Sequence, residues 1–163
     1  MTTQLRFYSF VAGLYISELQ KGLQTGHALT EMHATLLRNH SIMEVERDIY
    51  DDYCVNHKTI VILNALNSAG VEDAYSQLCD FGNRFQLPVS IFHEDEASLN
   101  GAATATGIIV PEQFFNAYKI DPTDRQEFPA YAYVPAGEVV GITYEANSYE
   151  SQFISFLKGY RLA

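Results

Sequence analysis

The stretch that decides the fold reads Leu19-Gln20-Lys21-Gly22-Leu23-Gln24-Thr25-Gly26-His27-Ala28. It follows an apolar run at residues 8–16 that is typical of a strand, and it opens a helical pattern that continues to residue 38. On a helix of about 3.6 residues per turn, one polar stripe recurs between apolar faces, and it contains Gln20, Gln24, His27 and Glu31. The sequence therefore predicts a strand followed by a long helix with a polar stripe.

Two glycines in this helix, Gly22 and Gly26, lie one turn apart and leave out two side chains. Each glycine costs a helix about 1 kcal/mol relative to alanine. That cost is understandable if another group approaches the helix backbone closely. The alternative is a solvated helix edge that tolerates glycine.

The rest of the chain predicts alternating strands and helices. Residues 58–64 are apolar and β-branched, as in a strand buried on both faces. Further strands are expected at 87–93 and 103–111, and helices at 42–50, 71–85 and 149–158. The buried face of helix 18–38 is expected to contain Leu19, Leu23, Ala34 and Leu37, broadened by Leu29, Met32 and Leu36. We therefore predict a single three-layer α/β domain over residues 1–163, with a four-stranded mixed sheet flanked by helices.

Residues 112–147 interrupt this alternation and look like an insertion before the last helix. They are rich in proline and tyrosine, and residues 130–134 and 138–143 could pair as a hairpin. Because tyrosine is enriched in protein interfaces, this Tyr-rich region is a candidate binding site for a protein partner.

Composition and charge exclude several classes of protein. The chain has 20 acidic and 10 basic residues, a formal net charge of −10, and no cluster of Lys and Arg. This charge opposes binding to nucleic-acid phosphates. No apolar run approaches the roughly 20 residues that cross a bilayer, and the N-terminus lacks a signal-peptide pattern. We therefore expect an acidic cytoplasmic protein with no membrane partner, and we expect its two cysteines to be reduced.

Two groups of polar residues could bind a substrate. In the first helix, His27, Gln24 and Gln20 could bind a polar substrate or position a water, or they could be satisfied structural residues. In the fourth strand, Thr104 and Thr106 share one face by the period-two rule. With the preceding Asn100, these hydroxyls could bind a phosphate, a carbonyl or a water, or they could be ordinary strand threonines.

An acidic group follows the third strand, where it reads His93-Glu94-Asp95-Glu96. Ligands of open α/β sheets bind beyond the carboxyl ends of strands, so these residues could supply a general base or a metal ligand. The alternative is a solvated acidic loop.

Weaker patterns do not change these expectations. His33 and His57 each begin a His-x-Thr pattern, as in two-histidine phosphoesterases, but the first lies inside a predicted helix and the copies are too close in sequence. Cys54 and His57 have metal-like spacing without a second ligand pair. The sequence contains no P-loop, GxGxxG or nucleophile elbow, so we expect no cofactor and no metal.

The order of these pieces resembles the archaeal and eukaryotic type of peptidyl-tRNA hydrolase, and the chain looks like a divergent, phage-type member. The family's first helix has a Gln followed by His-Ala, which resembles Gln24 and His27-Ala28 here. Its leucine-proline strand and the Asp after it look like residues 85–89 and Asp95. Its Thr-x-Thr strand ending in proline is similar to residues 104–111, and its last helix to residues 152–162.

The resemblance implies hydrolysis of the ester between a peptide and tRNA, or of a related small acyl ester. Asp95 would activate water, His27 and Gln24 would orient the substrate, and Lys21 would be an electrostatic partner. Further substrate contacts are expected from Gln20, Asn100, Thr104 and Thr106.

The chain departs from the family's pattern at two places. The family's catalytic-site lysine falls on Gln20, and its Arg-Thr pair falls on Ser98-Leu99. These departures favour an alternative, in which an inactive member of the fold binds or inhibits a protein partner through residues 112–147. A homodimer is also expected. Convergence of Lys21, His27 and Asp95 around a pocket would favour catalysis.

Overall fold

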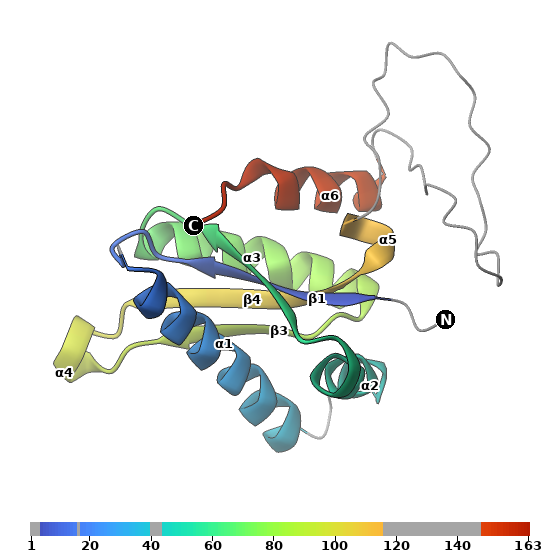
Figure 1. Cartoon of the computed structure of the whole chain (residues 1–163), viewed down its shortest axis with the longest axis horizontal. Helices are drawn as coiled ribbons and strands as arrows, with labels where there is room; N and C mark the ends of the chain where they lie inside the picture. The colour runs from blue at the N-terminus through green and yellow to red at the C-terminus, as the bar shows by residue number, and fades with distance from the viewer. Residues whose placement is uncertain (1–3, 16, 40–43, 116–147) are drawn as a thin grey trace, which may run out of the picture. The chain divides into compact units, whose positions relative to one another are not determined.

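The computed structural model describes residues 4–15, 17–39, 44–115 and 148–163 (Figure 1). In chain order the elements are β1 (Leu5–Val11), α1 (Glu18–Arg38), α2 (Glu44–Asp52), the π-helix η1 (Tyr53–His57), β2 (Thr59–Asn64), α3 (Ser68–Phe85), β3 (Val89–His93), α4 (Glu96–Leu99), β4 (Ala103–Pro111), α5 (Glu112–Phe115) and α6 (Tyr149–Gly159). The hairpin expected at residues 130–143 lies outside the described residues. Among the helices that are described, none is long and apolar enough to span a bilayer.

The four strands form one mixed sheet in the order β2-β1-β4-β3. Strand β2 is parallel to β1, and β3 is antiparallel to β4. Hydrogen bonds from Ala12 N to Thr104 O and from Glu112 N to Gln4 O show that β4 also runs antiparallel to β1. The predicted four-stranded mixed sheet of an α/β fold is confirmed, with β4 running against the other three strands.

Helices α1 and α3 cover opposite faces of the sheet (Figure 1). The Ser90 hydroxyl on β3 donates to the carbonyl of Ala28 in α1. The neighbouring Val89 side chain lies against Gly82 of α3. Because successive strand residues point to opposite faces, these contacts place one helix on each side of β3.

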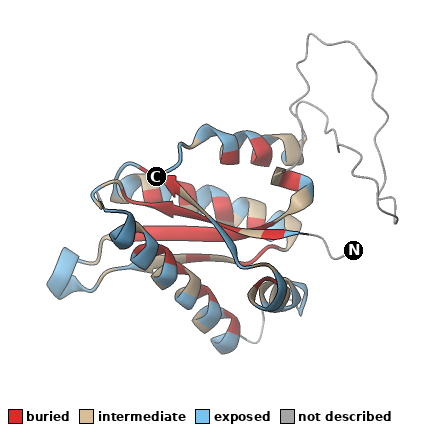
Figure 2. Cartoon of the chain, viewed as in Figure 1, coloured by how far each residue is buried: buried red, intermediate tan, exposed pale blue. Residues whose placement is uncertain are grey.

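The core lies along the two central strands, β1 and β4, which Figure 2 shows as buried over nearly their full length. On the α1 face, the Phe7 ring crosses β4 at Gly107. A Cβ at this position would overlap the Phe7 ring and would lie 3.0 Å from the Tyr8 carbonyl oxygen. Glycine is therefore required where an aromatic ring crosses the strand.

The predicted buried face of α1 is largely wrong. Its leucines at positions 19, 23 and 37 are 85%, 57% and 62% exposed. The face that packs on the sheet instead contains Gln24, Thr25, Ala28, Met32 and Leu36. Two polar residues can lie on this face because hydroxyl groups of the sheet hydrogen-bond to them, as when Thr25 donates to Ser9 Oγ at 3.0 Å.

The prediction that β2 is buried on both faces is also wrong. Only Leu63 of this strand is buried, and Ile60 is 45% exposed. The reason is its place in the sheet, since β2 is an edge strand and β1 occupies the interior position.

The chain divides into two compact units, Leu5–Val110 with Tyr160–Ala163, and Met1–Gln4 with Pro111–Gly159. In the first unit, Leu162 forms an antiparallel bridge to Leu63 of β2. In the described part of the second, Phe114 of α5 packs edge-on against Phe153 of α6, with ring centroids 5.1 Å apart. The single domain expected over residues 1–163 stays a prediction.

Candidate functional site

A chain of hydrogen-bonded side chains joins α1 to the ends of β3 and β4. Gln24 is only 4% exposed, and its Nε2 donates to Glu94 Oε1 at 2.8 Å. Its Oε1 accepts from the Thr104 hydroxyl at 2.7 Å. The Tyr15 hydroxyl donates to the same Glu94 oxygen at 3.1 Å. We call Tyr15, Gln24, Glu94 and Thr104 the Gln24 network.

The register of β3 against α1 builds this site. Alternate residues of β3 point to the α1 face and contact residues that step backward along the helix. The contacts pair Ser90 with Ala28, Phe92 with His27, and Glu94 with Gln24. The His27 and Phe92 rings stack with centroids 4.5 Å apart and planes 19° apart. The opening helix and the acidic end of β3 therefore meet at one place.

A β-bulge brings Thr104 into the network. Phe92 pairs with Ala105 and His93 pairs with Ala103, so Thr104 is an extra residue on β4. Both Thr104 and its neighbour Ala105 consequently contact the α1 side. Thr106 instead donates its hydroxyl to the Ser90 carbonyl at 2.6 Å. The expectation that Thr104 and Thr106 share one face fails because the bulge interrupts the two-residue alternation.

The expected base, Asp95, has the geometry of a helix cap. It is exposed, and its Oδ1 accepts hydrogen bonds from Ser98 Oγ and Ser98 N, both at 2.7 Å. These bonds lower the pKa of the Asp95 carboxyl from its usual value and make it a weaker base. The carboxylate that joins the network is its neighbour Glu94. Asn100 is also structural, since it ends α4 in the left-handed conformation.

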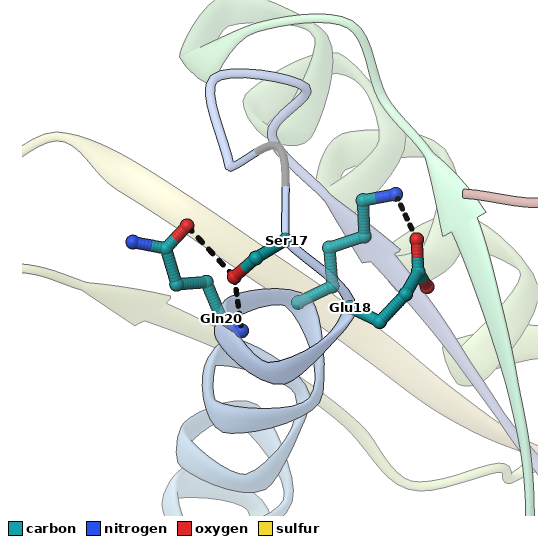
Figure 3. Close-up of polar contacts among 4 residues, drawn as sticks. Ser17, Glu18 and Gln20 are labelled. Carbon is teal, nitrogen blue, oxygen red and sulfur yellow. Dashed lines mark hydrogen bonds and ion pairs between the residues drawn. The ribbon is translucent and has the colours of Figure 1, made fainter.

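The expected contacts at the start of α1 are bonded within the first helical turn (Figure 3). Ser17 caps the helix, accepting from Gln20 N and donating to Gln20 Oε1. Lys21 Nζ pairs with Glu18 Oε1 at 3.0 Å, and the Lys21 side chain is only 14% exposed while that of Glu18 is 81% exposed. Lys21 is therefore a mostly buried cation about one turn before Gln24.

Lys21, His27 and Asp95 do not form a bonded cluster. Within the described part of the chain, no hydrogen bond or ion pair joins any two of them. His27 lies beside the Gln24 network through its stack on Phe92, whereas Asp95 faces Ser98.

The hydrogen bonds of the network hold the Glu94 side chain in one orientation. Burial, and next the Glu94 carboxylate that it contacts, raise the pKa of Tyr15, so the phenol remains a hydrogen-bond donor at neutral pH. The donors from Tyr15 and Gln24 both end on Oε1 of Glu94. Its Oε2 has no hydrogen-bond partner among the described residues. This oxygen can accept a proton from a water.

Sequence reasoning included Glu94 in the acidic run but chose Asp95 as the base, and it missed Tyr15. The signal for Glu94 was present, because counting by two from Ser90 along β3 reaches Phe92 and then Glu94, not Asp95. Tyr15 lies before α1 in a loop that has no periodic pattern. The described residues contain no group of three His, Cys, Asp or Glu side chains placed to hold a metal ion.

The sequence matches no protein-family model and no curated protein.

Proposed function

We propose that this chain hydrolyses the ester of peptidyl-tRNA or of a related acyl ester, with Glu94 as the base that activates water. The observation that carries the proposal is the buried Gln24 amide, which holds Oε1 of Glu94, while Oε2 has no hydrogen-bond partner among the described residues. A base fixed in this way can be within hydrogen-bond reach of a water that attacks a carbonyl.

The proposed reaction needs no cofactor. A water bound at Glu94 Oε2 gives its proton to that oxygen and adds to the ester carbonyl. The proton then passes to the departing hydroxyl group as the tetrahedral intermediate breaks down. The His27 imidazole, held by Phe92, offers ring nitrogens that can orient the substrate. The Lys21 ammonium can stabilise the oxyanion of the tetrahedral intermediate if its ion pair with Glu18 breaks and the ammonium binds the oxyanion instead.

The order of elements also supports this proposal. The succession β1, α1, β2, α3, β3, β4 and α6 follows the order on which the resemblance to peptidyl-tRNA hydrolases rests. Within that resemblance, we assign the acidic position after the third strand to Glu94 in place of Asp95.

Adjacent carboxylates provide a matched test. Hydrolysis of N-acetylaminoacyl-tRNA and of an uncharged acyl ester is measured for the wild type, Glu94→Gln and Asp95→Asn. Each variant removes one carboxylate charge. Glu94→Gln should lower kcat/KM by about 10²–10⁴-fold, since it removes the general base. Asp95→Asn should retain the activity, because asparagine also caps helices.

The proposal fails if the wild type leaves both substrates intact at high enzyme concentration. It also fails if Asp95→Asn abolishes turnover and Glu94→Gln does not.

The second candidate function is a protein-binding module without catalysis. The ion pair of Lys21 with Glu18 supports it, because this cation, about one turn before Gln24 on α1, is already neutralised. The net charge of −10, which disfavours tRNA, supports it too. Partner capture that survives Glu94→Gln and is lost when residues 116–147 become a Gly-Ser linker would favour this function, provided that the wild type shows no hydrolysis.

A further inference from the structure

The side of α1 that faces away from the sheet carries no Asp, Glu, Lys or Arg between the ends of the helix. We call it the outer face, and it comprises Leu19, Gly22, Leu23, Gly26, Thr30, His33 and Leu37, all of them exposed. The exposed charged residues of α1 are Glu18 in its first turn and Arg38 in its last. A helix face without Asp, Glu, Lys or Arg is unexpected on a chain with a net charge of −10.

The chemistry of the outer face suits contact with another protein surface. Its three leucines are 57–85% exposed, so water covers large apolar side chains. The Thr30 hydroxyl donates to the Gly26 carbonyl at 2.8 Å, which satisfies its hydrogen within the helix. Apart from the nearby backbone of α1 itself, no atom lies within 4 Å of a Cβ added at Gly22 or Gly26, so another backbone has room to approach closely.

We propose that the outer face of α1 binds the same face of a second copy of this chain, with the two helices antiparallel about a two-fold axis. Two copies that each carry a charge of −10 repel one another. Contact through the outer face places no carboxylates of one copy against carboxylates of the other. The proposal is independent of the proposed ester hydrolysis.

The outer face is self-complementary, as a two-fold interface requires. Centring the axis between Gly26 and Thr30 sets three pairs opposite one another across the two copies: Leu19 with Leu37, Leu23 with His33, and Gly26 with Thr30. Antiparallel packing also sets the acidic first turn of one helix beside the basic last turn of the other, and it opposes the helix dipoles favourably. A helix of 21 residues is only about 30 Å long, so the contact is modest and the dimer should be weak.

Sedimentation velocity of the full chain from micromolar to submillimolar concentration tests the proposal. The wild type should shift reversibly from monomer to dimer. Leu23→Lys should weaken dimerisation by about a hundredfold or more, because it would bury an unpaired ammonium opposite His33 of the second copy. The control, Leu66→Lys, makes the same chemical change at a residue that is 77% exposed in the β2–α3 loop, and it should dimerise like the wild type. Circular dichroism verifies that both variants are folded.

A wild type that remains monomeric throughout this range overturns the proposal. So does a dimer that Leu23→Lys leaves unchanged, or one that both variants weaken equally. If chemical crosslinks in the monomer join the outer face to residues 116–147 of the same chain, that segment is the occupant and the second copy is not.

Discussion

Gln24 is best understood as a positioning residue. Both ends of its amide are bonded to protein partners, with Nε2 donating to Glu94 and Oε1 accepting from Thr104. It therefore has little capacity left to bind a substrate directly, in contrast to the expectation from the polar stripe. Its effect on a reaction would come through the orientation of the Glu94 carboxylate.

Variants of two threonines on β4 test the stability of the sheet and the function of the Gln24 network separately. Thr104→Val removes the hydroxyl that donates to the buried Gln24 Oε1, and Thr106→Val removes the hydroxyl that donates to the Ser90 carbonyl. Each should lower the free energy of unfolding by about 1 kcal/mol, the usual net contribution of a hydrogen bond. Only Thr104→Val should also lower kcat, because Thr104 alone of the two bonds to Gln24.

Chemical denaturation and hydrolysis assays on both variants measure these effects. Equal losses of activity in Thr104→Val and Thr106→Val would contradict the role given to the Gln24 network, since general loosening of β4 would then explain both.

At the scale of elements, α1 illustrates what the sequence can and cannot predict. Its bounds, Glu18–Arg38, were predicted correctly because a long periodic pattern follows a strand and precedes a break. Its buried face was predicted wrongly, because Leu19 and Leu23 were assigned to the core on their hydrophobicity alone. Burial of Gln24 depends on partners in β3 and β4, which are far away in sequence and cannot be seen from a helical pattern.

The β-bulge at Thr104 was beyond prediction for a similar reason. Alternation along β4 is a local rule, whereas an extra residue in the pairing is a property of two strands together. The acidic run at the end of β3 could be located from the sequence. The choice between Glu94 and Asp95 depended on which face of β3 meets α1.

A pair of glycines tests the packing of these elements. Gly107→Ala should lower the free energy of unfolding by about 1–3 kcal/mol or more, because the new Cβ overlaps Phe7 and crowds the Tyr8 carbonyl oxygen in a closely packed core. Gly26→Ala should raise it by up to about 1 kcal/mol, because nothing lies within 4 Å of the added Cβ and alanine favours a helix.

Urea denaturation of dilute protein compares the two glycine variants under conditions in which association is negligible. If Gly107→Ala and Gly26→Ala are destabilised alike, the crossing of Phe7 over Gly107 is not the cause of the lower stability of Gly107→Ala.

At the scale of the whole molecule, charge sets the sign of the response to salt. Proteins that bind nucleic acid through Lys and Arg release counterions, so their affinity falls as salt concentration rises. This chain carries 20 acidic and 10 basic residues, and Lys21, about one turn before Gln24 on α1, is paired with Glu18. If tRNA is the substrate, its phosphates meet net repulsion, which salt screens over about 10 Å at 0.1 M.

We therefore expect kcat/KM for N-acetylaminoacyl-tRNA to rise as the salt concentration increases from low values, chiefly through a lower KM. Hydrolysis of an uncharged acyl ester by the same enzyme is the control, and it should change little because no long-range repulsion opposes that substrate. A kcat/KM for the tRNA ester that falls steeply with salt would instead require a local cluster of Lys and Arg at the binding surface. Measuring both substrates across one salt series therefore distinguishes a repelled tRNA from one held by a basic patch.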